Sequence, residues 1–324
     1  KFLSSEPDWF DRDRFILSAG HGSMLLYSVL YLAGYPDITL EDIKNFRQLN
    51  SKTAGHPEYG HISGIETTTG PLGQGLGNAV GMAIAEEFIG TRWGSDLCDH
   101  YTYVIAGDGC LMEGISQEVI SLAGKLKLKK LIVIWDDNGI TIDGGVDLSC
   151  DTDQISRFKS SGWSTFSCDA HNPIEIDRAI NNAKKDNRPS LIAAKSIIGY
   201  GSTAKQGTSG AHGAPLGKNE VEQLRQNFGW HHKEFVIPTD IKKSWVKIGQ
   251  KNHKVFKDWS DRFQSLSEKK RIAFLNELDQ IFPSKLSRSI KNFKKLYSQE
   301  IQTEIATRKA SELCLDLINE CFNN

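Results

Sequence analysis

Two short polar motifs in this sequence could hold a divalent cation. Gly107-Asp108-Gly109 follows an apolar β-type run, and Asp136-Asp137-Asn138-Gly139-Ile140 follows the next such run, one helix further along the chain. The carboxylate of Asp108, the amide oxygen of Asn138 and a backbone carbonyl near Ile140 are hard oxygen ligands suited to Mg²⁺ or Ca²⁺. Either motif alone is also typical of an ordinary turn. Their pairing at successive strand ends is more specific and favours a metal site.

A glycine-rich stretch at residues 67–77 leads into a helical pattern over residues 78–88. Small residues on one side of that helix would let a ligand approach the backbone closely. The glycine spacing does not match the dinucleotide-binding fingerprint, and no clear strand precedes the stretch. We therefore interpret it as a binding loop of another kind.

Three histidines stand beside glycines: His21, His56 and His212. His212 lies in a glycine-rich loop, residues 199–217, and a loop of this length inside a compact domain is usually functional or mobile. One such histidine would more often be incidental. Three of them indicate a polar pocket, with chance placement as the alternative.

The elements that would position these residues alternate between strand and helix. Four strands are expected, at residues 101–106, 131–135, 163–168 and 191–198. Helical patterns separate them, which predicts an α/β fold: a doubly wound, mostly parallel sheet with helices on both faces. Ligands bind such sheets at the carboxyl ends of the strands. We therefore expect the chemistry directly after Ala106, Trp135 and Ile198.

Charge divides the chain near residue 230. Residues 1–230 carry a net negative charge, whereas residues 231–324 carry a net positive charge and show amphipathic helical patterns. We interpret the second region as a helical arm rather than a second globular core. Its lysines alternate with acids and lack an aromatic stacking platform, so a nucleic-acid surface is the weaker alternative.

Bulk composition excludes several classes of protein. Lys and Arg (39) nearly balance Asp and Glu (40) among 324 residues, which indicates no nucleic-acid or membrane partner. No apolar run approaches the roughly 18 residues that a membrane-spanning helix needs. The 6 cysteines are scattered without a C-x-x-C pair, as is typical of reduced thiols in a cytoplasmic protein.

Five strings in the sequence resemble transketolase. They cover residues 13–22, 52–58, 66–75, 107–114 and 209–217. Gly-Asp-Gly followed by Asn is shared by thiamine-diphosphate enzymes generally, whereas Gly-His-Pro-Glu, Thr-Thr-Gly-Pro-Leu-Gly-Gln-Gly and His-Gly-Ala-Pro-Leu-Gly are typical of transketolase itself. The resemblance runs from about residue 9 to residue 324 and is strongest up to residue 230. It implies a diphosphate-binding domain over residues 1–230 and a helical linker over residues 231–324, which leads toward a pyrimidine-binding domain that is absent here.

The resemblance also implies a role for each matching residue. Asp108, Asn138 and the carbonyl of Ile140 would hold the metal ion. The cofactor would contact His21, Gly109 and His212 at its diphosphate and Gly70, Pro71 and Leu72 at its aminopyrimidine. Ile142 would pack under the folded cofactor, and Asn138 would also be a cofactor-binding residue. His56 and His212 would be catalytic, hydrogen-bonding the substrate's hydroxyl and carbonyl oxygens. Glu113 would lie at a dimer interface.

The implied cofactors are thiamine diphosphate and Mg²⁺, for which Ca²⁺ could substitute. The implied reaction moves a two-carbon ketol unit from a ketose phosphate, xylulose 5-phosphate or sedoheptulose 7-phosphate, to an aldose phosphate in the pentose phosphate pathway. The full-length protein would be a homodimer. Dihydroxyacetone synthase and phosphoketolase differ mainly in segments outside this sequence, so the acceptor stays open.

Some parts of the family's site have no counterpart among residues 1–324. They are the glutamate that activates the aminopyrimidine, a further N-terminal histidine and the arginines that bind the substrate phosphate. We therefore expect a transketolase half, truncated at both ends, that binds Mg²⁺-diphosphate but is inactive alone. Two alternatives are a subunit of a split transketolase and a non-catalytic Mg²⁺-diphosphate-binding module.

Overall fold

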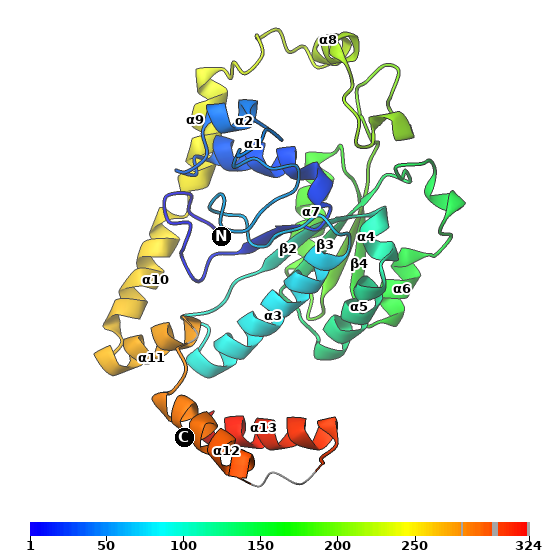
Figure 1. Cartoon of the computed structure of the whole chain (residues 1–324). Coiled ribbons are helices and arrows are strands. Elements are labelled where there is room, and N and C mark those ends of the chain that lie inside the picture. Colours follow the sequence, from blue (N-terminus) through cyan, green and yellow to red (C-terminus); the bar gives the residue numbers. More distant parts are fainter. Residues whose placement is uncertain (280, 300–303, 323–324) are drawn as a thin grey trace. The chain divides into compact units, whose positions relative to one another are not determined.

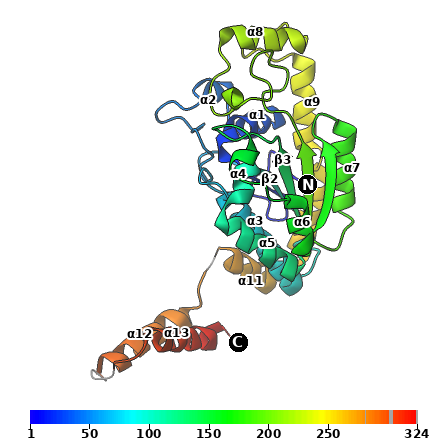
Figure 2. The ribbon, with the colours of Figure 1, turned by 90° about the vertical axis from the view of Figure 1, so that its right-hand side faces the viewer.

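The structure is a computed structural model that describes residues 1–279, 281–299 and 304–322 (Figure 1; Figure 2). The chain divides into two compact units, Lys1–Ser260 and Asp261–Asn324. The first unit contains the sheet and every predicted site residue, and the second is helical. Residues 280, 300–303, 323 and 324 belong to the predicted helical arm and lie outside the described residues.

Five parallel strands form one sheet in the first unit. In sheet order they are β1 (Arg14–Leu17), β2 (Thr102–Gly107), β3 (Leu131–Asp137), β5 (Ser190–Lys195) and β4 (Ser164–Asp169). The predicted α/β class is confirmed, and every strand pairing is parallel. The sequence pattern does not predict β1, because its four residues begin with an arginine and only two of them are buried. β5 ends three residues before the predicted boundary at 198.

Helices flank the sheet in the order that the alternating pattern predicts. Those of the first unit are α1 (Ser23–Ala33), α2 (Leu40–Lys44), α3 (Gln74–Trp93), α4 (Asp108–Met112), α5 (Gly114–Leu126), α6 (Gln154–Ser160), α7 (Pro173–Ala183), α8 (Lys218–Asn227) and α9 (Thr239–Gln250). The boundary between the two units falls within α10 (His253–Ser265). Three short 3-10 turns, η1 (Gly20–Gly22), η2 (Val146–Leu148) and η3 (Ser209–Ala211), lie in the loops.

Alternate strand residues enter separate cores on the two faces of the sheet. Val104 and Val133 belong to the core that α3, α5 and α6 cover. On the opposite face, Ile105 packs against the cluster of α1, and Ile132 packs in the cluster of α7. Because both faces are covered, the strands read as nearly continuous apolar runs. This arrangement leaves the carboxyl edge of the sheet as the place for polar chemistry.

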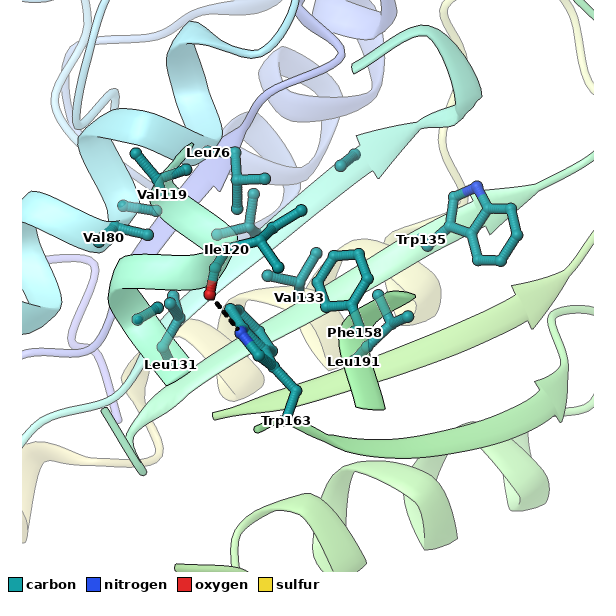
Figure 3. Packing of buried hydrophobic residues seen from close by; sticks show 14 of the residues in the cluster. Leu76, Val80, Val119, Ile120, Leu131, Val133, Trp135, Phe158, Trp163 and Leu191 are labelled. Carbon is teal, nitrogen blue, oxygen red and sulfur yellow. Dashed lines mark hydrogen bonds between the residues drawn. The ribbon is translucent and has the colours of Figure 1, made fainter. Parts of the chain in front are cut away.

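The buried indole of Trp163 connects the loop after α6 with α5 (Figure 3). Trp163 donates from Nε1 to the carbonyl oxygen of Ile120 over 2.8 Å, and its ring meets Phe158 edge-on with centroids 4.9 Å apart. A buried tryptophan normally satisfies its N–H in this way. The indole therefore fixes the position of α5, whose first residues follow the predicted metal motif.

Most of the described chain beyond residue 230 is helical, as the amphipathic patterns predict. After α9 and α10 it forms α11 (Glu268–Leu278), α12 (Ser284–Gln299) and α13 (Thr307–Phe322). α9 packs against α1, where Lys242 donates to the hydroxyl of Tyr31 over 3.0 Å. The functional division at residue 230 is not tested by this packing and stays a prediction. Among the described residues, no helix is both long enough and apolar enough to cross a membrane.

Candidate functional site

Asp108 stands at the carboxyl end of β2, where it opens the short helix α4. Its Oδ1 accepts a hydrogen bond from Nε1 of Trp135 over 2.9 Å, and its Oδ2 accepts the backbone N–H of Gly139 over 3.2 Å. The register explains this meeting, because Gly107 of β2 pairs with Asp136 of β3. The two polar motifs of the sequence therefore lie side by side at one edge of the sheet.

The local electrostatics at Asp108 favour a cation. The residue is only 8% exposed, and burial raises its pKa to about 6, against the opposing hydrogen bond from Trp135. The negative charges of Asp137 and Asp136 add to that rise. A divalent ion at this edge would offset both the burial of the carboxylate and the repulsion among the acids.

The turn after β3 presents the amide that the sequence pairs with Asp108. Oδ1 of Asn138 accepts the backbone N–H of Ile140 over 2.9 Å, and its Nδ2 donates to Oδ2 of Asp136 over 3.0 Å. These bonds orient the side chain, while the amide oxygen keeps a second lone pair for another partner. Ile142 is 66% exposed beyond this turn, so it has apolar surface available for a ligand.

The three predicted histidines also gather near this edge. His21 follows β1 inside η1, and its ring stacks on that of His212 with centroids 5.0 Å apart and planes 24° apart. Burial lowers the pKa of His21, and His212 and His56 lower it further, whereas Asp136 raises it. These mutual effects place the histidines within electrostatic range of one another and of the acidic turn.

The glycine-rich stretch packs against both His56 and the Asp108 motif. Thr69 donates from Oγ1 to the carbonyl of Leu17 over 2.9 Å, which anchors the stretch to the end of β1. A Cβ on Gly70 would lie 3.3 Å from the ring of His56, and one on Gly109 would lie 2.9 Å from Cδ1 of Leu72. Glycine at these positions therefore permits close packing.

The structure thus brings most of the predicted site residues close together, while a few others are exposed to solvent. Those in mutual contact or near one another are His21, His56, Gly70, Leu72, Asp108, Gly109, Asn138 and His212. Pro71, Ile142 and Glu113 are exposed. Glu113 packs against Gly73, and its predicted place in a dimer interface stays a prediction.

Comparison with known proteins decides the family. The model of the family described as transketolase, thiamine diphosphate binding domain, matches residues 1–286. The chain belongs to the transketolase family. Curated transketolases of Rhodobacter capsulatus and Cereibacter sphaeroides are 53% and 51% identical to it, in both cases over 98% of this chain. The matches cover 47% and 48% of those proteins, so the chain spans about half the length of the curated transketolases that it matches.

Solved transketolases share the fold. A transketolase of Pichia stipitis, crystallised in complex with sedoheptulose 7-phosphate, superposes with a TM-score of 0.88 at 40% identity, over 99% of this chain and 48% of that one. The transketolase of Leishmania mexicana superposes with a TM-score of 0.87 at 38% identity, over 99% of this chain.

The residues at the carboxyl edge fit the cofactor that names this transketolase domain. Nδ1 of His212 is buried without a hydrogen-bond partner among the described residues, which leaves it available to an anionic group such as a diphosphate. Asp108 is a buried carboxylate with acids beside it, which suits Mg²⁺. Contacts within the described residues leave the nitrogen of His212 without a partner, whereas Asp108 already accepts two hydrogen bonds.

Three features of this candidate site escape the sequence patterns. β1 is too short to be recognised, although it brings His21 to the edge of the sheet. Trp135 is expected only as a strand residue, yet its indole orients Asp108. Ser196 donates from Oγ to Asp136 and so helps to hold the acidic turn. The position of Trp135 beside two consecutive acids, Asp136 and Asp137, is the one signal that the sequence offered.

A second buried polar cluster lies at the opposite, amino-terminal edge of the sheet. Nδ1 of His100 lies 3.4 Å from Oδ1 of Asp11 and 3.9 Å from Sγ of Cys98. In the described residues this is the one group of three acidic, histidine or cysteine side chains spaced for a metal ion. The carboxylate of Asp11 already accepts the N–H of Asp99 and the ammonium of Lys1, each over 2.6 Å. Hydrogen bonding therefore accounts for the cluster.

We expect His100 to make the folded state sensitive to acid. Burial lowers its pKa from 6.5 to about 4, so the unfolded chain binds the proton more readily as the pH falls from about 6.5 to 4. Stability is therefore lost over that window, by up to about 3 kcal/mol. Urea unfolding at pH 7 and at pH 4.5 measures the free energy of unfolding of the parent protein and of His100→Gln. The difference between the two proteins should be smaller at pH 4.5 than at pH 7. A difference that is independent of pH would contradict the prediction.

Proposed function

We propose that this chain binds thiamine diphosphate through Mg²⁺ at the carboxyl edge of its sheet. Asp108, Asn138 and the carbonyl of Ile140 hold the ion, for which Ca²⁺ can substitute. The observation that carries the proposal is the hydrogen bond from Gly139 to Asp108, since it joins the two motifs that the family uses for the metal. The stacked pair of His21 and His212 serves the diphosphate, and the influence of Asp136 on the pKa of His21 supports its place near the acidic turn.

Each remaining residue of the site takes a role in binding. His21, Gly109, Asn138 and His212 contact the diphosphate; Gly70, Pro71 and Leu72 contact the aminopyrimidine; Ile142 packs beneath the cofactor. Because the pKa of His21 is lowered, its ring stays neutral near neutral pH and donates one hydrogen bond from one nitrogen. Its neutral form also avoids charge repulsion with the adjacent His212.

The chain's catalytic contribution is to position groups around a reactive cofactor. Bound thiamine diphosphate supplies the electron sink that lets a ketose phosphate break a carbon–carbon bond. His56 and His212 hydrogen-bond the substrate's hydroxyl and carbonyl oxygens and stabilise the negative charge that develops there. One well-placed donor of this kind contributes about 3 kcal/mol to the transition state.

The whole protein transfers two-carbon ketol units between sugar phosphates in the pentose phosphate pathway, as a homodimer in which Glu113 meets the partner. The complex of the Pichia stipitis transketolase with sedoheptulose 7-phosphate supports this class of substrate. All six cysteines are free thiols, which supports a cytoplasmic location. Because the chain spans about half of its relatives, we propose that their other half completes the site.

Isothermal titration of the chain with thiamine diphosphate tests the proposal. We expect binding in the presence of Mg²⁺ and none in the presence of a chelator, because the ion bridges the acids and the diphosphate. We also expect no transfer from xylulose 5-phosphate by residues 1–324 alone. Equal binding of thiamine diphosphate with Mg²⁺ and with a chelator would contradict the proposal, and so would turnover by these residues alone.

A further inference from the structure

Two buried hydroxyl groups of α1 point at the segment that carries His56. Ser23 and Tyr27 are one helical turn apart, and both are 0% exposed. Ser23 donates from Oγ to the carbonyl of Gly55 over 2.8 Å. The hydroxyl of Tyr27 lies 3.0 Å from the carbonyl oxygen of Ala54 and 3.2 Å from that of His56. Three consecutive carbonyl groups are therefore held by one face of one helix.

The same segment is fixed at both of its ends. Thr53 donates from Oγ1 to the carbonyl of Asp42 over 2.6 Å and accepts the backbone N–H of Arg47 over 2.9 Å. On the other side, the carbonyl of Pro57 accepts the N–H of Thr69 over 3.2 Å. The backbone around His56 is thus held by several hydrogen bonds, although its imidazole ring is exposed.

The helix that makes these bonds directly follows the 3-10 turn that contains His21. η1 ends at Gly22 and α1 starts at Ser23, so His21 and the two hydroxyl groups belong to one continuous stretch of helical backbone. The ring of His56 also packs close to Gly70, because a Cβ on Gly70 would lie 3.3 Å from that ring. The separation of His21 and His56 is therefore set by α1.

We propose that Ser23 and Tyr27 are positioning residues that hold the backbone of His56, and thereby its imidazole, in the place from which it reaches the substrate oxygens. The inference rests on the proposed function, in which His56 contacts substrate. An exposed ring on an anchored backbone can meet a ligand and still keep a defined place. Neither hydroxyl touches the cofactor or the substrate in this proposal.

Tyr27→Phe isolates the hydroxyl from the rest of the side chain. The ring packs in the core beside α1, with the ring of Phe46 6.2 Å away, and phenylalanine keeps that packing. Ser23→Ala removes the neighbouring donor with little change in volume. Tyr31→Phe is the matched control, because Tyr31 lies one turn further along α1 and its hydroxyl bonds Lys242 instead.

Hydrogen–deuterium exchange on the full-length protein measures the anchoring without any turnover. In Tyr27→Phe and Ser23→Ala we expect the amides of residues 53–56 to exchange about tenfold faster, because the carbonyl groups of this segment lose partners of ordinary hydrogen-bond strength. Tyr31→Phe should leave these amides unchanged. Unchanged exchange in both test variants would overturn the inference.

A double-mutant cycle with His56→Ala then assigns the effect to His56. We expect Tyr27→Phe to lower kcat/KM about tenfold in the full-length protein, with unchanged affinity for thiamine diphosphate, and to have no further effect in the His56→Ala background. Losses that add in full would show that Tyr27 acts elsewhere and would overturn the inference. A parent protein that fails to bind thiamine diphosphate would instead overturn the proposed function, while the exchange experiment still reports whether the anchoring exists.

Discussion

Replacing Asp108 with asparagine should weaken the Mg²⁺-dependent binding of thiamine diphosphate by about a hundredfold or more. Loss of an outer-shell partner of a metal ligand already costs 10–100-fold in metal affinity, and Asp108 would be a direct ligand. Asparagine keeps the size of the side chain and can still accept the indole N–H of Trp135, so the fold should persist. Titration calorimetry with Mg²⁺ and the cofactor measures the loss.

The matched control for this experiment is Asp143→Asn. Asp143 is exposed in the loop that follows the Asn138 turn, so the substitution removes the same charge from the same region without touching the proposed metal. We expect its affinity to equal that of the parent protein. Equal affinity in Asp108→Asn would contradict the metal assignment, and equal losses in both variants would show that only the general negative charge of the loop matters.

Replacing Gly124 with alanine should destabilise the first unit by about 3 kcal/mol or more. Gly124 lies on α5, and a Cβ there would stand 1.7 Å from the carbonyl oxygen of Ser161. Because the clash is with a backbone atom, it cannot be relieved by a change of side-chain rotamer. α5 must therefore move away from the loop that contains Ser161 and Trp163. Overpacking of a dense core typically costs 1–3 kcal/mol, and a clash with backbone lies at or above that range. Urea unfolding measures the change.

Gly81→Ala is the matched control for Gly124→Ala. Gly81 lies inside α3, and a Cβ there would meet nothing within 4 Å. Alanine is a better helix former than glycine, so this variant should gain up to about 1 kcal/mol. If Gly124→Ala proved as stable as Gly81→Ala, the close approach of α5 to the 161–163 loop would be wrong.

Much of the architecture could be predicted because its strands are buried on both faces. Leu131–Asp137 starts with five apolar residues, a composition that strands covered on both faces typically have. Once parallel strands are assigned, the meeting of Asp108 with the Asn138 turn follows from their shared edge. β1 could not be predicted in this way, because a four-residue strand at the end of the sheet has too little apolar surface to show a pattern.

By itself, the sequence determined the α/β class, the edge of the sheet at which polar side chains collect, and the resemblance that the comparisons confirmed. These depend on local patterns and on motif strings, which are read along the chain. Only the tertiary structure decided which atoms meet: Trp135 and Gly139 at Asp108, His212 against His21, and the hydroxyl groups of α1 beneath His56. Such contacts join residues far apart in the chain, and their distances are set by helix packing and strand register, which no local pattern specifies.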